Sequence, residues 1–137
     1  MDKALNLLSL ARKAGLAELG EEPVGAAARA LHAHLIVVAK DASDHTWRRA
    51  KSYTAGTDQI CIRVNYTKDE LGFAIGRQEL AMAAIVDAGM ALSFVEGLGQ
   101  PEKHGDTIAV LTEKKKKAAQ RQKEAKAHKK NLRKGKK

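Results

Sequence analysis

Apolar residues near the start of the chain recur with helical spacing. The first set is Ala4, Leu7, Leu8 and Ala11, and the second set is Val24, Ala27, Ala28 and Leu31. The spacing i, i+3, i+4, i+7 predicts two amphipathic helices. Asp2 is a suitable cap for the first helix, and Gly15 is a suitable stop. The second helix is expected to begin near Pro23, because proline is tolerated at the first position of a helix.

Three short apolar runs predict buried strands, and helical segments separate them. The runs cover residues 35–39, 59–64 and 81–86, and the further helices are expected over 44–54, 68–75 and 88–96. Thr67 and Glu70 have the spacing of a capping box, and Asp87 is a cap for the last of these helices. Helices alternating with short strands predict an α/β fold, a three-layer α/β/α sandwich with a small mixed sheet of about four strands.

The composition changes after this domain, to which we assign residues 1–97. Residues 98–112 are predicted to be a linker, because glycine and proline are frequent in its first half. The apolar segment 107–111 within it is expected to add a short edge strand or to dock on the core. Residues 113–137 form a Lys/Arg-rich tail that favours helix intrinsically but offers no apolar face. We therefore expect this tail to be disordered or conditionally helical.

The positive charge of the chain is confined to that tail. The formal net charge is +9, from 25 Lys/Arg and 16 Asp/Glu. Residues 113–137 hold 13 Lys/Arg and 2 Glu, a net charge of +11, which leaves the other 112 residues with a net charge of −2. Cationic segments bind phosphate backbones with little sequence preference. The tail therefore predicts nucleic-acid affinity, whereas the domain carries no general basic surface.

Other features exclude several classes of function. Cys61 is the one cysteine and lies in an apolar run, so we expect a buried, unreactive thiol. The sequence shows neither a secretory signal pattern nor an apolar run near the roughly 20 residues that cross a bilayer, which predicts a cytoplasmic protein without a membrane partner. His32 and His34 lack further ligands at metal spacing, and no nucleophile–base pattern stands out. We expect no metal, no cofactor and no enzymatic activity.

Three stretches of the domain have a familiar order and spacing. They are residues 10–15 with 20–22, residues 35–41, and residues 67–76, which contain Leu71-Gly72-Phe73-Ala74-Ile75-Gly76. Together they resemble the kink-turn RNA-binding ribosomal-protein superfamily of the L-seven-Ae and L-thirty-e type, and most closely its small bacterial YlxQ-like members. The resemblance covers about residues 3–96. It implies an α/β/α sandwich that binds structured RNA, with the ribosome or translation factors as further partners.

In that superfamily the RNA lies against the start of the second helix. Free backbone N–H groups and the positive end of the helix dipole suit phosphates and base edges there. The resemblance implies RNA-binding positions at Gly20, Glu21, Glu22, Gly25, Trp47, Lys68 and Arg77. Trp47 takes the place of an apolar residue near an extruded base, but it equally fits core packing. Arg77 lies in a loop that closes over RNA in relatives, but it equally fits a solvated surface arginine.

Three positions depart from the superfamily pattern. The polar pair that reads guanines falls on Glu22 and Pro23, and a lysine one turn later falls on Ala26. A carboxylate repels phosphate, and proline has no polar side chain. These departures argue against the standard kink-turn readout.

The sequence leaves three hypotheses for the function. In the first, the domain docks structured RNA, which the resemblance implies is ribosomal, and the tail adds phosphate contacts from Lys114, Lys115, Lys116, Lys117 and Arg121. In the second, the domain is a protein–protein interaction module and only the tail binds nucleic acid. In the third, the domain is a carrier for a tail that binds any polyanion. A purely solubilising tail is a further interpretation of the same charge run.

Overall fold

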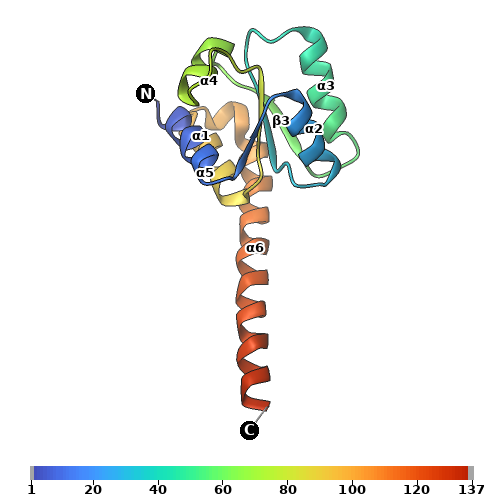
Figure 1. The fold of residues 1–137 in the computed structure, drawn as a ribbon. Helices are drawn as coiled ribbons and strands as arrows, with labels where there is room; N and C mark the ends of the chain where they lie inside the picture. Colours follow the sequence, from blue (N-terminus) through green and yellow to red (C-terminus); the bar gives the residue numbers. More distant parts are fainter. Residues whose placement is uncertain (1, 136–137) are drawn as a thin grey trace.

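The computed structural model describes the backbone of residues 2–135 and the side chains of residues 2–126 (Figure 1). Helices and short strands alternate through the domain, as predicted. The elements are α1 (Lys3–Lys13), β1 (Ala17–Leu19), α2 (Glu21–Arg29), β2 (Leu35–Val38), α3 (Asp44–Thr54), β3 (Ile60–Arg63), α4 (Lys68–Ala74), β4 (Met82–Ile85), α5 (Ala88–Gly97) and α6 (Pro101–Gly135).

The sheet is mixed and has the strand order β1-β4-β2-β3. Strand β4 pairs antiparallel with β1 and β2, whereas β2 and β3 are parallel. The two central strands, β2 and β4, are buried along their whole length, which explains why they are continuous apolar runs. The fourth strand is β1, which the sequence did not reveal. Residues 107–111 are helical, so the predicted edge strand there is wrong.

Helices cover both faces of this sheet and complete the predicted three-layer sandwich (Figure 1). Helices α2 and α3 pack together on one face, and α1, α4 and α5 lie on the other. The first part of α6 packs against α5, and the rest of this helix extends away from the domain. Among the described residues, no helix is both long and apolar enough to span a bilayer.

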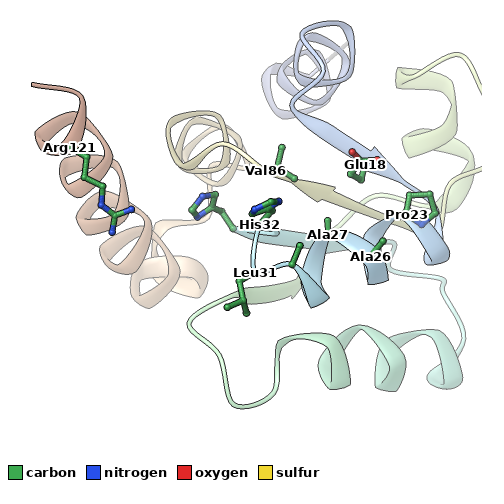
Figure 2. A pocket seen from close by; sticks show the side chains of 10 residues that line it. Glu18, Pro23, Ala26, Ala27, Leu31, His32, Val86 and Arg121 are labelled. Atoms are coloured by element: carbon green, nitrogen blue, oxygen red, sulfur yellow. The ribbon is translucent and has the colours of Figure 1, made fainter. Parts of the chain in front are cut away.

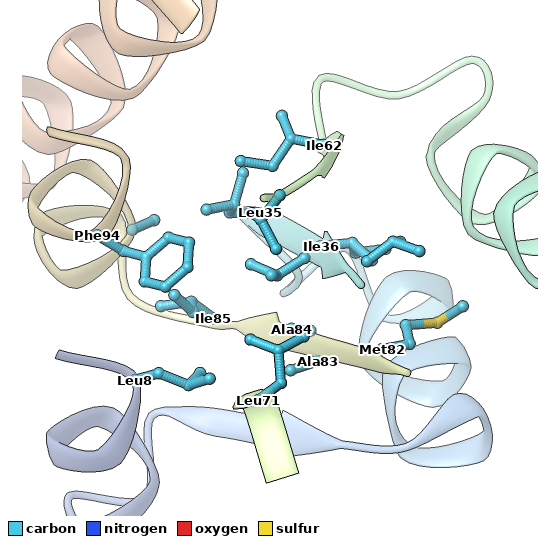
Figure 3. Packing of buried hydrophobic residues seen from close by; sticks show 14 of the residues in the cluster. Leu8, Leu35, Ile36, Ile62, Leu71, Met82, Ala83, Ala84, Ile85 and Phe94 are labelled. Atoms are coloured by element: carbon cyan, nitrogen blue, oxygen red, sulfur yellow. The ribbon is translucent and has the colours of Figure 1, made fainter. Parts of the chain in front are cut away.

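The core between these layers is aliphatic, as the aromatic content of 4% predicts. Figure 3 shows Leu8, Leu71 and Phe94 projecting from three different helices toward the central strands. All three side chains are fully buried. Ala83 and Ala84 on β4 are small and fully buried, which leaves room for these larger side chains to pack at high density.

Local capping signals were good guides to helix starts. The Ser43 hydroxyl accepts the N–H of Thr46 at the start of α3, and the Asp87 carboxylate accepts the N–H of Met90 at the start of α5. The capping box of Thr67 and Glu70 is present at α4. Each bond satisfies an N–H group that the helix itself leaves without a partner.

Two predicted helix starts differ from the structure. Asp2 occupies the cap position of α1, but its side chain makes no capping bond there and instead accepts the hydroxyl of Tyr66 at 2.8 Å. Burial, together with this hydrogen bond, raises the pKa of Tyr66 to about 12. Helix α2 begins at Glu21, with Gly20 as its cap residue, and not at Pro23.

Helix α6 runs through the segment predicted as a linker and on into the tail. His104, Ile108 and Leu111 recur at i, i+4 and i+7, and Leu111 is fully buried in the core. The linker prediction is therefore wrong, and the segment docks on the core as an amphipathic helix. The helix has one non-helical residue, His104, with φ −114° and ψ 17°. Residues 113–135 continue as helix, in line with their intrinsic propensity.

Candidate nucleic-acid interface

The start of α2 offers backbone donors without a capping side chain. Gly20 has φ +93°, a conformation that glycine adopts without strain, and its own N–H donates to the carbonyl of Met82. No side chain of the described residues caps the helix after it. The helix therefore presents N–H groups and a positive dipole end toward its surroundings, an arrangement that favours anions.

The guanidinium of Arg77 lies beside this helix start. A Cβ atom added to Gly20 would be 4.0 Å from Nη1 of Arg77. Arg77 is exposed and follows Gly76, whose φ of +74° turns the chain after α4. The structure thus brings two predicted positions, Gly20 and Arg77, together from segments more than fifty residues apart.

The first turn of α2 also carries two carboxylates, and only one of them is paired. The Nε atom of Arg49 on α3 lies 2.8 Å from the carboxylate of Glu21, and this ion pair offsets the charge of Glu21. Glu22 and the neighbouring Pro23 are exposed. The position that the resemblance assigns to RNA contact therefore holds one unneutralised carboxylate.

Lys68 lies at the first position of α4, next to the loop that follows β2. Its backbone N–H donates to the carboxylate of Asp41 at 2.8 Å, and its carbonyl accepts the N–H of Leu80. Asp41 therefore caps α4 from a distant segment. The Lys68 side chain is half-buried beside this loop.

Gly25 is not part of the exposed surface, contrary to the expected RNA contact. It is buried under Tyr53 of α3, and an added Cβ would lie 3.0 Å from the Tyr53 ring. Glycine therefore allows α2 to pack closely on α3 without displacing the Tyr53 ring. A buried backbone position cannot contact a ligand in this conformation.

Trp47 lies apart from the start of α2. Its ring is half-buried, packs against the core and has the Arg63 guanidinium at 5.1 Å and the Lys51 ammonium at 5.8 Å from its centroid. Trp47 and Arg49 are separated by two positions, which is about 200° around a helix, and Arg49 is the side chain that reaches α2. The packing interpretation of Trp47 is therefore the better one, and its ring faces cations.

The basic helix α6 and the end of α2 form the walls of a cleft of about 640 Å³ (Figure 2). Leu31 and His32 line it from the turn after α2, and Arg121 faces them from α6. A second cleft of about 290 Å³ shares Arg121 and adds Lys117. The tail residues Lys117 and Arg121 are thus placed next to the domain.

Lys114 has a structural role in the docking of α6. Its ammonium donates to the backbone carbonyl of Asp58 at 2.6 Å and lies 3.9 Å from that residue's carboxylate. Burial lowers the pKa of Lys114, and Asp58 opposes this shift. Lys115, Lys116 and Lys117 remain exposed, although Lys116 lies 3.7 Å from the carboxylate of Glu113.

The described residues contain no cluster of three or more His, Cys, Asp or Glu side chains that could hold a metal ion. His34 is half-buried, and burial followed by the charge of Lys114 lowers its pKa. Cys61 is half-buried and not fully buried as expected, and burial raises the pKa of its thiol. A raised pKa reduces the thiolate fraction, which agrees with the predicted low reactivity.

The sequence interpretation missed Arg49 and His104. Arg49 gave no signal, because its pairing with Glu21 depends on how α3 packs beside α2. His104 was hidden in a segment rich in glycine, although its spacing with Ile108 and Leu111 is helical. That spacing is the signal that would have identified the segment as a helix.

The chain matches no protein-family model and no curated protein. Among solved structures, it is similar to a protein of unknown function from Bacillus halodurans C, with a TM-score of 0.67 and 27% identity over 72% of this chain and 99% of that chain. It is also similar to the Giardia lamblia 15.5kD RNA binding protein, with a TM-score of 0.54 and 18% identity over 74% of this chain and 86% of that chain. The predicted α/β/α sandwich is therefore a fold that this chain shares with both proteins.

Proposed function

We propose that this protein binds structured RNA. The start of α2 and the loop after α4 contact the folded RNA, and the exposed lysines and arginines of α6 follow its phosphate backbone. The observation that carries this proposal is the position of Arg77 beside the uncapped start of α2. A guanidinium next to free N–H donors suits a phosphate, because both make charge-assisted hydrogen bonds to its oxygens.

The comparisons support the same class of ligand. The Giardia protein of this fold is named an RNA binding protein. The sequence resemblance to the kink-turn RNA-binding superfamily covers the same domain, and it makes ribosomal RNA in the cytoplasm the first target to test. A role in translation or ribosome function belongs to this proposal.

The RNA is expected to differ from a standard kink-turn. Glu22 and Pro23 are both exposed at the start of α2, where the superfamily pattern has polar residues that read guanines. Arg49 offsets the charge of Glu21, whereas Glu22 is exposed and forms no ion pair with another described side chain, so its carboxylate repels approaching phosphates. We therefore expect weak binding to a standard kink-turn and tighter binding to another folded RNA.

The test is a binding titration with the full chain at several salt concentrations. The RNAs are ribosomal RNA fragments, a standard kink-turn and an unstructured strand of equal length. Arg77→Ala should weaken binding to the preferred folded RNA by about tenfold, because a charge-assisted hydrogen bond contributes about 1.5–3 kcal/mol. Arg12→Ala changes an exposed arginine of α1, across the sheet from α2, and should leave binding unchanged.

Equal binding of Arg77→Ala and the unaltered chain, with no preference for folded RNA, would contradict the proposal. That result would favour the alternative in which the domain binds another protein, and one surface feature supports this alternative. Phe73 on α4 is 76% exposed and shares a shallow pocket with Asp2, Asp69 and Glu70. The negative charge of these carboxylates and the exposed Phe73 ring would suit a basic protein segment that carries an apolar side chain.

A further inference from the structure

A separate pocket of about 400 Å³ lies where the parallel strands β2 and β3 end. Lys40 follows β2, Arg63 ends β3, and Asn65 comes two residues later. The first turns of α6 close the pocket with Lys103 and His104. Ligands of α/β proteins are commonly bound beyond the carboxyl ends of parallel strands.

The pocket wall carries three cationic side chains and, among its described residues, no carboxylate. Lys40 and Lys103 are exposed, so both ammonium groups are free to move toward a ligand. Arg63 is held more firmly. Its Nη2 donates to the carbonyl of Ala42 at 3.2 Å, and its guanidinium lies 5.1 Å from the centroid of the Trp47 ring. A cation–π contact of this kind fixes the orientation of the guanidinium.

Two buried polar atoms at this pocket have no partner. The Nε atom of Arg63 and the Nε2 atom of His104 are inaccessible to solvent and make no hydrogen bond to any described residue. His104 is only 4% exposed, and it is the residue at which α6 departs from helical geometry. A buried polar group without a partner costs roughly 1–3 kcal/mol. Such atoms call for an explanation, and a missing ligand is one.

We propose that this pocket binds a phosphate monoester group. Three cations without a carboxylate suit a dianion, and the volume falls within the range of about 300–1,000 Å³ typical of small-molecule sites. Arg63 contributes planar, directed donors, and Lys40 and Lys103 contribute mobile point charges. The bearer of the phosphate is a small phosphorylated molecule or the phosphorylated end of an RNA strand.

This site shares only helix α6 with the proposed RNA-binding surface. It uses no residue of α2 or of the loop after α4. In this site the Trp47 ring holds the Arg63 guanidinium in place by a cation–π contact and does not stack on the ligand. The site depends on α6 being docked, because Lys103 and His104 come from that helix.

The chain contains one tryptophan, and this tryptophan lies in the pocket wall, so its fluorescence reports on the site. We would titrate the full chain with inorganic phosphate and, separately, with potassium chloride at matched ionic strength. The tryptophan fluorescence is expected to change saturably with phosphate and not with potassium chloride. Lys103→Gln and Arg63→Gln should each weaken phosphate binding by about tenfold. Lys13→Gln changes an exposed lysine of α1 and should bind phosphate as the unaltered chain does.

The absence of a saturable change beyond that of potassium chloride would overturn the proposal. Unaltered affinity of Lys103→Gln would overturn it as well. If Arg63→Gln does not fold, Lys40→Gln replaces it, because Lys40 is exposed and outside the core. Uridine 5′-monophosphate and a pair of RNA oligonucleotides, with and without a 5′-phosphate, identify the bearer. If the 5′-phosphate increases the affinity for the oligonucleotide and Lys103→Gln abolishes this increase, the bearer is an RNA end. If only the mononucleotide competes with inorganic phosphate, the bearer is a small molecule.

Discussion

At Gly72, α4 lies close to the backbone of the loop that follows it. A Cβ atom added there would lie 2.6 Å from Cα and 2.7 Å from the backbone nitrogen of Glu79. Both are backbone atoms, so a flexible side chain cannot relieve the overlap by rotating away. This contact explains why the Leu-Gly-x-Ala-x-Gly element needs glycine at its second position. It also fixes the loop that carries Arg77, since the N–H of Arg77 donates to the carbonyl of Gly72.

Gly72→Ala should therefore destabilise the protein by about 1–3 kcal/mol, the usual cost of forcing extra volume into a packed site. The measurement is urea unfolding followed by circular dichroism. Gly105→Ala is the matched control, because nothing lies within 4 Å of its added Cβ and the residue is in a helix. It should change the free energy of unfolding by less than about 0.5 kcal/mol, because Gly105 directly follows the non-helical His104 and lies away from packed side chains. Equal unfolding midpoints for the two variants would refute this account.

The sequence identified some individual residues of the candidate site. Gly20 and Arg77 were both identified, although only the structure shows that they are neighbours. Gly25 was predicted as an RNA contact, but it packs under Tyr53. For Trp47 the sequence left both a base contact and core packing open, and its half-buried ring lies beside Arg63. One cause underlies both results. The direction in which a residue faces depends on the helix packed beside its own, and a single sequence does not contain that information.

Elements with strong local signals were predicted well. Strands β2 and β4 are continuous apolar runs, and α3, α4 and α5 begin at side chains that cap them. Strand β1 was missed because it has only three residues and exists through pairing with β4, which lies more than sixty residues later. The start of α6 was mistaken for a linker because its glycines and proline outweighed the helical spacing of its inward side chains.

Leu111 anchors α6 to the domain and provides a test of this docking. Its side chain is fully buried, so Leu111→Ala should cost about 2–5 kcal/mol of the free energy of unfolding. Val110 is the neighbouring residue and is 40% exposed, so Val110→Ala should cost much less. Thermal and urea unfolding of both variants check the prediction. Similar losses for the two variants would mean that α6 does not dock through Leu111.

Charge divides the whole molecule into two parts. The tail, residues 113–137, has a net charge of +11, whereas residues 1–112 have a net charge of −2. General attraction to phosphates therefore comes from the tail, and any discrimination among RNAs must come from the domain. The last fully buried apolar side chain is Leu111, so shortening the chain after residue 112 keeps the described hydrophobic core but removes the contact between Lys114 and Asp58.

Deletion of residues 113–137 should weaken RNA binding and flatten its salt dependence. A plot of log K against log salt concentration has a negative slope. Each phosphate contact that is lost reduces the magnitude of this slope by about 0.9 for duplexes and by about 0.7 for single strands. The preference for the favoured folded RNA should persist. Binding titrations at four or more salt concentrations measure both quantities. An unchanged slope after the deletion would show that the tail does not contact RNA.

The extension of α6 beyond the domain has a consequence for how the molecule moves in solution. At 1.5 Å per residue, the helix from residue 113 to residue 135 is about 33 Å long, roughly the diameter of a small domain. Such a molecule diffuses as an elongated body, with slow end-over-end rotation and faster rotation about the long axis. Backbone N–H bonds in α6 lie nearly parallel to that axis, so their ¹⁵N relaxation is governed by the slow rotation. Sedimentation is correspondingly slower than for a sphere of equal mass.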